Sequence, residues 1–461
     1  MNQRTLSVAI IILIMASFGR LSAEGTGELA PTPQDSVMLH TNAPGFGNFA
    51  SFTSDSMHRL YVSIEDFTNE ILYIGLSAEH NDFGQLDAGS ASYMFQIRGP
   101  SGAIVFGPIL IGAANDNATT WLQASSGPDV LDPVNGYSTN TSSFPYSTFV
   151  PTSNGDYSME FFDGGTIANI MWYDFTVVSG GTEQPGRLWS HNWALRSPPR
   201  NPNQLPECQF DRSFEGVFYS YTEDGFVSRI DFANSGFQGL SFTVAFGDSG
   251  PGNTGDVMAD RRSVNDMNAT ANAADHKVFL NDPDITLYPS SLSQCGAVTL
   301  LNVSCEAPDS FCINVGVTRP GQVDIILDFN QNGVFDMNSQ DVLIVDIFPV
   351  ADTACFPWNG LKGDGTPIAF GEDIPAIIKY FQGVQHYSAF DVEFLKNGFC
   401  VQTIRPICSG VATDLLYWDD SQITDDVVTV TIDEGDPGTG QPKIQFNGCQ
   451  CGTGGCRTWT T

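Results

Sequence analysis

The sequence predicts an all-β protein built from tandem antiparallel β-sandwich modules of the immunoglobulin-like (Ig-like) type. Short runs of alternating apolar and polar residues recur along the chain, and turn-forming residues separate them, with 46 glycines and 26 prolines in 461 residues. No long segment shows the 3.6-residue apolar period of an amphipathic helix. Short strands with regular turn punctuation are typical of antiparallel sandwiches.

The first 23 residues have the composition of a secretory signal peptide. Arg4 precedes an apolar run over residues 6–18, and the small residues Ser22 and Ala23 end the segment. The apolar run is too short for a spanning helix, and no later segment approaches the necessary length. We therefore expect removal of residues 1–23, a secreted or cell-surface location, and no transmembrane segment in the mature chain.

Two β-rich modules are expected after the signal peptide. The first covers residues 24–180 and has strand patterns at residues 59–64, 71–74, 93–97, 103–106, 157–162 and 172–178. A Gly-rich linker leads from it into the second module, residues 187–290. The second module contains a predicted hairpin, with strands at 217–221 and 226–232, and a further strand at 240–246.

A third, Ig-like sandwich is expected over residues 291–432, followed by a Cys/Gly-rich tail over residues 433–461. The chain has ten cysteines and none precedes Cys208. In an exported chain this content indicates disulfides rather than zinc. Cys305 and Cys312, like Cys400 and Cys408, are near enough in sequence for local bridges, but spacing alone does not fix the connectivity.

The segment that begins at Asp328 is the strongest candidate site. It follows a strand pattern at residues 323–327, and oxygen-bearing side chains occupy every second position before a glycine. This pattern is the beginning of a loop that wraps Ca²⁺ with side-chain oxygens and one backbone carbonyl. The predicted ligands are Asp328, Asn330, Asn332, the carbonyl of Val334, Asp336 and Asp341.

Two features distinguish this segment from an EF-hand. Loop position twelve, where an EF-hand has a bidentate glutamate, is Ser339, so Asp341 is the expected closing carboxylate. The preceding strand also argues against a helix–loop–helix arrangement. We expect a structural calcium ion that ties a turn inside a β-module. The alternative is an Asx-rich turn that needs no metal.

The charge balance excludes one class of partner. The net charge is −33, from 52 acidic and 19 basic residues. A field of this sign repels nucleic acid and anionic lipid. Because only 15% of residues are charged, the imbalance reflects a scarcity of Lys and Arg. Solubility in a salty medium explains it more simply than an acidic binding surface does.

Sequence signals for catalysis are weak, and we predict no catalytic residues. Residues 247–251 resemble the nucleophile segment of chymotrypsin-like proteases, but no histidine lies in the family's context. Asp419 and Asp420 follow two aromatic residues, Tyr417 and Trp418, which would suit a sugar site. Adjacent strand residues point to opposite faces, however, so this pair cannot face one substrate.

Trp189 and Trp193 lie at the start of the second module. Two tryptophans four residues apart near a module boundary favour a buried plug between modules, and a ligand or sugar platform is the alternative.

Several blocks together resemble the N-terminal halves of large secreted surface proteins of gliding bacteria, whose C-termini carry a gliding-motility-associated module. The blocks are residues 187–193, 220–246, the Asp328 loop, 358–367 and 416–421. The segment 358–367 is also similar to a turn in the Ig-like module of flagellar hook-capping proteins, where a tryptophan packs under a Gly-rich hairpin.

The resemblance implies export and a role as an adhesin or scaffold at an extracellular surface, with a glycan or protein ligand. This chain ends at Thr461 without the sorting module of that group, so its tethering, and whether it is a fragment, stay open. The predicted function is that of a secreted, calcium-stabilised, non-enzymatic structural or adhesin-like protein. The alternatives are a carbohydrate-binding module and a secreted glycosidase.

Overall fold

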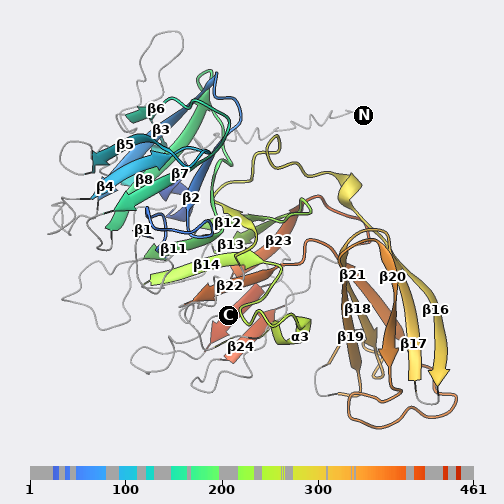
Figure 1. The fold of residues 1–461 in the computed structure, drawn as a ribbon. Helices are drawn as coiled ribbons and strands as arrows, with labels where there is room; N and C mark the ends of the chain where they lie inside the picture. The colour runs from blue at the N-terminus through green and yellow to red at the C-terminus, as the bar shows by residue number, and fades with distance from the viewer. Residues whose placement is uncertain are drawn as a thin grey trace, which may run out of the picture.

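A computed structural model confirms that the chain is nearly all β, with antiparallel sheets (Figure 1). The residues that it describes are 24–30, 37–41, 48–78, 93–111, 121–128, 147–162, 168–196, 216–232, 241–260, 262, 264, 274–307, 310–333, 335–336, 339–390, 399–410, 429–433 and 443–447. Its helices in these ranges are short: α1 (Thr26–Leu29), α2 (Trp121–Ser126), α3 (Val257–Asp260) and the 3₁₀ helix η3 (Leu292–Gln294). No helix in the described part of the chain is long and apolar enough to cross a bilayer.

Two large sheets form the main body of the molecule. The first runs in the order β22 (His386–Phe390), β14 (Ser241–Gly247), β11 (Asn192–Arg196), β1 (Met38–Thr41), β8 (Ala168–Ser179), β3 (Glu70–Ala78) and β6 (Ser147–Phe149), with β9 (Thr182–Glu183) paired to β8. The second runs β24 (Thr429–Asp433), β25 (Lys443–Asn447), β23 (Phe399–Arg405), β13 (Val227–Asp231), β12 (Val217–Tyr221), β15 (Lys277–Phe279), β10 (Leu188–Ser190), β2 (Leu60–Ile64), β7 (Gly155–Phe162), β4 (Met94–Arg98) and β5 (Ile104–Leu110).

The core of the main body lies between these two sheets. The ring of Phe175 on β8 lies 6.0 Å from that of Phe95 on β4, a strand of the other sheet. Farther along the same sheets, Trp193 on β11 lies 6.3 Å from Phe218 on β12. Both pairs belong to one continuous cluster of buried apolar residues. Alternation along each strand therefore directs apolar side chains into a single shared interior.

The structure differs from the predicted boundary between residues 24–180 and 187–290. Strand β10 pairs with β2, where Leu188 lies opposite Val62, and β11 pairs with β1. The two segments thus share both sheets. The Gly-rich residues between them form the turn of the β8–β9 hairpin and the approach to β10. A polar turn and a linker have the same composition, and only strand pairing distinguishes them.

Residues 296–382 form a separate unit, which we call the inserted module. One of its sheets has the order β16 (Val298–Ala307), β17 (Ser310–Val317) and β20 (Asp352–Trp358). The other has the order β19 (Val342–Phe348), β18 (Gly321–Leu327) and β21 (Ala376–Phe381). A second core cluster, which includes Val323, Ile325 and Phe356, fills this module. In Figure 1 it stands to the side of the main body.

The inserted module ends earlier than the predicted third sandwich, residues 291–432. After β21 the chain returns to the main body, because β22 pairs with β14 in the first sheet and β23 pairs with β13 in the second. The chain therefore leaves the main body after β15 and re-enters it at β22. The predicted tail at 433–461 is corrected in part, because its residues Lys443–Asn447 form β25 and pair with β23 and β24; most of its other residues lie outside the described ranges.

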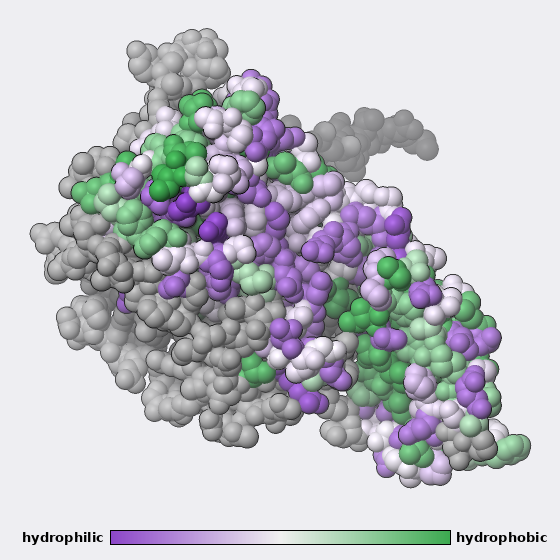
Figure 2. Space-filling view, in the orientation of Figure 1, coloured by the Kyte–Doolittle hydropathy of each residue, from purple (hydrophilic) through white to green (hydrophobic). Residues whose placement is uncertain are grey.

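The outer face of the β19–β18–β21 sheet carries both apolar and polar side chains, because Gln322 and Asp324 lie on it together with Ile326. Val323, Ile325 and Leu327 of β18 point into the module core, so Ile326 points outward, opposite Leu343 and Ile377 on the flanking strands. Figure 2 shows apolar surface gathered on the side of this module nearest the main body.

Two disulfides are present among the described residues, and they differ from the local pairs considered from sequence. Cys295 bonds to Cys408, and Cys312 on β17 bonds to Cys355 on β20. Cys305 is exposed and free. The pairing follows the sheet, since β17 and β20 are neighbouring strands, and not the distance along the chain.

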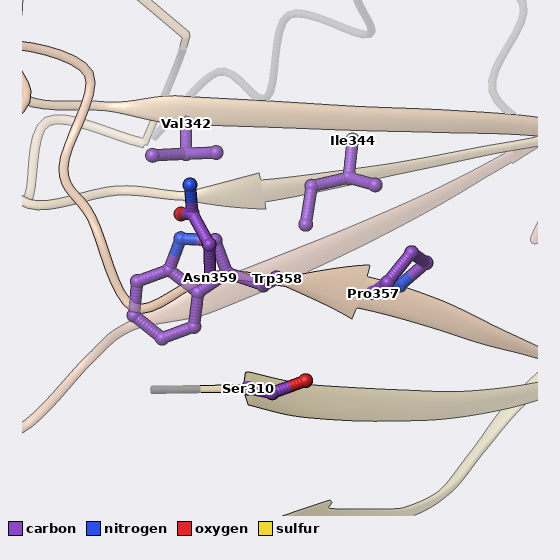
Figure 3. A pocket seen from close by; sticks show the side chains of 6 residues that line it. All are labelled: Ser310, Val342, Ile344, Pro357, Trp358 and Asn359. Carbon is purple, nitrogen blue, oxygen red and sulfur yellow. The ribbon is translucent and has the colours of Figure 1, made fainter. Parts of the chain in front are cut away.

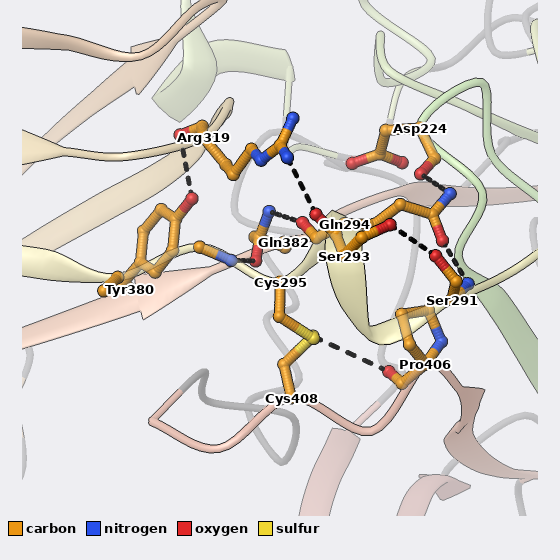
Figure 4. Close-up of a disulfide and its surroundings, with 12 residues drawn as sticks. Asp224, Ser291, Ser293, Gln294, Cys295, Arg319, Tyr380, Gln382, Pro406 and Cys408 are labelled. Atoms are coloured by element: carbon orange, nitrogen blue, oxygen red, sulfur yellow. Dashed lines mark hydrogen bonds between the residues drawn. A yellow bond between two sulfur atoms is a disulfide. The ribbon is translucent and has the colours of Figure 1, made fainter.

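The connection between the inserted module and the main body, which we call the neck, is held by amide side chains and the Cys295–Cys408 bond (Figure 4). Gln382 accepts the backbone N–H of Gly296 at 2.6 Å and donates to the carbonyl of Gln294 at 3.0 Å. Gln294 in turn donates to the carbonyl of Asp224, in the β12–β13 turn, at 2.6 Å. The two chain crossings are thereby fixed to each other and to the main body.

Candidate cation-binding loop

The predicted calcium segment forms the loop between β18 and β19 of the inserted module. Asp328 directly follows β18, and Asp341 directly precedes β19. These strands confirm that a strand, and not a helix, precedes the loop. Because β18 and β19 are paired along their whole length, the sheet brings the two ends of the loop together. Asp328 and Asp341 are each only 3% exposed.

Asp341 is the centre of the loop's hydrogen bonding. Its Oδ1 accepts the N–H of Phe329 at 2.9 Å and that of Asn330 at 3.3 Å. Its Oδ2 accepts the N–H of Asp336 at 3.2 Å and the side-chain Nδ2 of Asn330 at 3.2 Å. The residue expected to close the loop therefore does join its beginning to its end.

The turn of the loop depends on Gly333. Its φ is +89°, a left-handed conformation that glycine adopts without strain, and its N–H donates to Asp328 Oδ2 at 2.8 Å. Asp328 Oδ1 accepts the N–H of Asn332 at 3.3 Å. Asp328 thus fixes the turn from one side while Asp341 fixes it from the other.

Asp336 accepts hydrogen bonds from both asparagine side chains. Its Oδ2 accepts Nδ2 of Asn330 and Nδ2 of Asn332, each at 2.6 Å. Of the six predicted ligand residues, Asp328, Asn330, Asn332, Asp336 and Asp341 thus share one hydrogen-bonded loop. The carbonyl of Val334 lies outside the described residues.

The donor set fits a hard cation after one local change. The NH₂ groups of the two asparagines now face the carboxylates, where a cation would be attracted. A half-turn of each amide exchanges NH₂ for the carbonyl oxygen, and in Asn330 it gives up the 3.0 Å hydrogen bond that Oδ1 accepts from the N–H of Asn332. Oxygen donors of this kind are those that Ca²⁺ prefers. In the geometry observed for the described residues, no three His, Cys, Asp or Glu side chains form a metal-binding group.

The Gly-rich hairpin over residues 358–368 packs against the loop. The N–H of Gly363 donates to the carbonyl of Gln340 at 2.9 Å, and a Cβ at Gly363 would lie 2.3 Å from the carbonyl oxygen of Asp341. Lys362 lies 5.0 Å from the centre of the Phe329 ring and bonds Glu372 at 2.6 Å, which holds the pKa of that carboxyl below its usual value. Two segments that the sequence singled out separately therefore form one end of the module.

An open groove of about 370 Å³ lies between β19 and β20 (Figure 3). It is lined by Ser310, Val342, Ile344, Pro357, Trp358 and Asn359. Trp358 is only 7% exposed, packs 5.2 Å from the Phe311 ring, and donates its indole N–H to the carbonyl of Leu361 at 2.8 Å. Its faces are used within the core, so the groove does not provide a stacking platform for sugar.

The tryptophans at the start of the second predicted module are both buried. Trp193 is fully buried in the main-body core, and Trp189 stacks on Tyr61 at 4.3 Å with Lys277 Nζ 3.6 Å from its ring centre. Neither presents a face to a ligand. They lie inside the main body and not at a boundary between two modules, because the strands of residues 24–180 and 187–290 share both sheets.

Of the two candidate catalytic motifs, the structure describes the protease-like segment at residues 247–251. The backbone N–H groups of Asp248 and Ser249 bond Asp275, and His276 lies 3.4 Å from Asp248. This side-chain pair holds the pKa of the Asp248 carboxyl below its usual value. Asp419, Asp420 and the aromatic residues before them lie outside the described residues.

Comparison with known proteins adds no assignment. No model of a protein family matches the chain, and no curated protein or solved structure matches it significantly.

Proposed function

We propose that this chain is an exported, non-enzymatic structural or adhesin-like protein in which a calcium ion braces an Ig-like sandwich module inserted into a larger β-sheet body. One observation carries the proposal: the carboxylates of Asp328, Asp336 and Asp341 belong to one hydrogen-bonded loop at the end of a small β-module. The resemblance to secreted surface proteins of gliding bacteria supports the same class of function.

The brace acts on a module that has little core of its own. Its two sheets have three strands each among the described residues, so few apolar side chains separate them. Small domains with limited cores commonly depend on disulfides or metals. Here Cys312–Cys355 joins two strands of one sheet, and the loop ties together β18 and β19 of the other. The two devices thus stabilise different sheets.

The disulfides also suit the proposed location. Bridges of this kind form and persist in oxidising compartments, outside the cytosol. Extracellular calcium modules bind with Kd values of about 10⁻⁴–10⁻³ M, so the brace would respond to calcium in the surroundings. The ion would act on stability and not on a reaction.

The test compares thermal unfolding in calcium and in chelator. At ~10 mM Ca²⁺, roughly 10–100 times such a Kd, binding to the folded state alone adds about 1.4–2.7 kcal/mol. We expect the melting temperature to rise with calcium in the wild-type chain. Asp328→Asn removes one ligand charge and should lower the melting temperature in calcium to the value measured in chelator.

Asp373→Asn is the matched control, because it removes one negative charge from an exposed position of the same module. It should keep the full calcium response. Identical wild-type melting curves in calcium and in chelator would establish the metal-free Asx-rich turn and overturn the calcium proposal. Saturable binding on a glycan array would instead establish the carbohydrate-binding alternative.

A further inference from the structure

The segment that follows the predicted signal peptide is docked deep in the main body. The carbonyl of Glu24 accepts the N–H of Phe175 at 2.9 Å, and the hydroxyl of Thr26 accepts the N–H of Tyr173 at 2.9 Å. Leu29 and Ala30 are fully buried in the core. Residues 24–30, which we call the N-terminal segment, therefore occupy a specific place beside β8.

Acidic side chains gather where this segment begins. Glu24 is fully buried, and its carboxylate accepts the backbone N–H of Gly186 at 2.6 Å and the side-chain Nδ2 of Asn281 at 3.5 Å. The carboxylate of Glu28 accepts the N–H of Gly25 at 2.8 Å. These donors are neutral amides, so they supply hydrogen bonds but no positive charge to groups that are negative when ionised.

Asp174 supplies an independent sign that a partner belongs here. It is fully buried and pairs with Gly25 in an isolated antiparallel bridge. Its Oδ1 accepts the hydroxyl of Thr176 at 2.5 Å, but its Oδ2 has no hydrogen-bond partner among the described residues. Burial of a carboxylate oxygen that has no hydrogen-bond donor is unfavourable, because the oxygen loses its hydrogen bonds to water and forms none within the protein.

The buried cation next to this cluster, Arg187, is already paired with other carboxylates. Arg187 is fully buried, and its guanidinium contacts Asp284 at 2.9 Å, Glu65 at 3.1 Å and Glu70 at 3.2 Å. The guanidinium is thus committed to carboxylates other than those of the N-terminal segment. Burial raises the pKa of Glu24 and that of Glu28 to about 8, as expected where counter-charge is scarce.

We propose that cleavage of the peptide bond before Glu24 creates the missing counter-charge, an α-ammonium group that pairs with the carboxylates of Glu28 and Asp174. Water adds across the Ala23–Glu24 bond, which leaves a carboxylate on Ala23 and an amino group on Glu24. That amino group is protonated near neutral pH, with an ordinary pKa of about 8.

The position of the new group follows from the chain itself. The nitrogen of Gly25 lies 2.8 Å from the Glu28 carboxylate, and the nitrogen of Glu24 is one residue away, so it is within about 6 Å of that carboxylate. Opposite charges at this range favour each other's ionised form. Processing would thereby turn a destabilising acidic cluster into an ion-paired one, independently of any calcium brace.

The reactivity of the Glu24 amine tests the pairing directly. Three forms of the purified chain are compared: one that begins at Glu24, one that begins at Ala23, and the first form acetylated at its α-amine. Competitive acylation at pH 8 should label the Glu24 amine on the order of tenfold more slowly than the Ala23 amine, because ion pairing keeps the former protonated. The melting temperature of the Glu24 form should exceed those of both other forms.

Glu28→Gln and Asp174→Asn should each reduce the labelling difference, while Glu223→Gln, at an exposed position of the β12–β13 turn, should preserve it. Because labelling uses the wild-type sequence, the test holds even where a variant folds poorly. Equal labelling rates and equal melting temperatures for the Glu24 and Ala23 forms would overturn the proposal. A different N-terminal residue in the exported protein, by mass spectrometry, would overturn it as well.

Discussion

Arg187 is the residue on which the electrostatics of the main body most depend. It is fully buried and contacts Asp284 and Glu70 within 3.2 Å, and the carbonyl of Ser63 also accepts one of its N–H groups. Removing one partner of such a network leaves the others buried and uncompensated, which commonly costs about 3–5 kcal/mol.

We expect Arg187→Gln to lower the free energy of unfolding by about 3–5 kcal/mol, measured by denaturant unfolding. Arg319→Gln is the control, because Arg319 is an exposed cation with a hydrogen bond to the carbonyl of Ser293, and its loss should cost less than about 1 kcal/mol. Similar losses for the two variants would contradict the assigned role of Arg187.

The N-terminal acids also predict a pH dependence with a definite sign. Burial raises the pKa of Glu24 and of Glu28 from 4.5 to about 8, so between these values the folded chain binds more protons than the unfolded chain. Stability contributed by these groups is therefore present at low pH and lost as the pH rises from about 4.5 through about 8. The groups that face them are Asp174, Glu183, Asn281 and the backbone of Gly25, Gly186 and Arg187.

This dependence should be strongest in the chain acetylated at Glu24, where no α-ammonium offsets the carboxylates. The free energy of unfolding of that form, from denaturant titrations, should fall between pH 5 and pH 8 by a few kcal/mol as an order of magnitude. In the form with the free amine the fall should be smaller, and Glu28→Gln should flatten it in both. A free energy of unfolding that rises over this range would contradict the expected sign.

The sequence predicted which residues gather in the loop at Asp328, but not which residues gather around Glu24. The sequence singled out the loop at Asp328 because its predicted ligands lie close together along the chain, and the structure brings five of these six residues into one hydrogen-bonded turn. The cluster around Glu24 was not visible, because Asp174 comes from a strand almost 150 residues later. Spacing reveals sites within one segment, but not those that a sheet assembles from several.

At the scale of elements, alternation located most strands well. The predicted run at residues 59–64 became β2 (Leu60–Ile64), and 217–221 became β12 (Val217–Tyr221) with its hairpin partner β13. Short strands that lack alternation were missed, such as β1 (Met38–Thr41), which is buried at every position. A strand covered on both faces carries no period-two signal.

The disulfide at the neck belongs to this scale, since it joins two loops rather than two strands. It closes a separation of 113 residues. A loop of about that length gains on the order of 4–5 kcal/mol in the chain-entropy estimate. We expect the double variant Cys295→Ser/Cys408→Ser to unfold at lower denaturant and to be cut faster by protease at the neck.

Cys305→Ser is the matched control, because Cys305 is exposed and free. It should leave both the unfolding midpoint and the rate of proteolysis unchanged. If the double variant resists protease as well as wild type does, the amide contacts of Gln382 and Gln294 hold the neck by themselves.

At the scale of the whole molecule, local patterns gave the fold class but not the assembly. An all-β chain follows from strand and turn composition, whereas the sharing of two sheets by residues on both sides of the predicted linker depends on which strand edges meet. The insertion of one module inside another depends on the same long-range pairing. The pairing of β10 with β2, or of β23 with β13, cannot be predicted from the sequence of either strand alone.

The insertion predicts that the two parts of the molecule can be separated. Their core clusters have no residue in common, and the chain enters and leaves the inserted module at adjacent points, where Gly296 N lies 2.6 Å from Gln382 Oε1. Replacing residues 297–381 by a Gly-Ser linker of about four residues should therefore leave the main body folded, because closing so short a gap costs little entropy. Cooperative thermal unfolding and a monomeric gel-filtration profile would show this.

Residues 296–382 alone should keep the calcium-dependent transition, since β18, β19 and the loop between them all lie within that segment. Loss of cooperative unfolding in both pieces would show instead that the outer face of the β19–β18–β21 sheet and the main body stabilise each other across the neck.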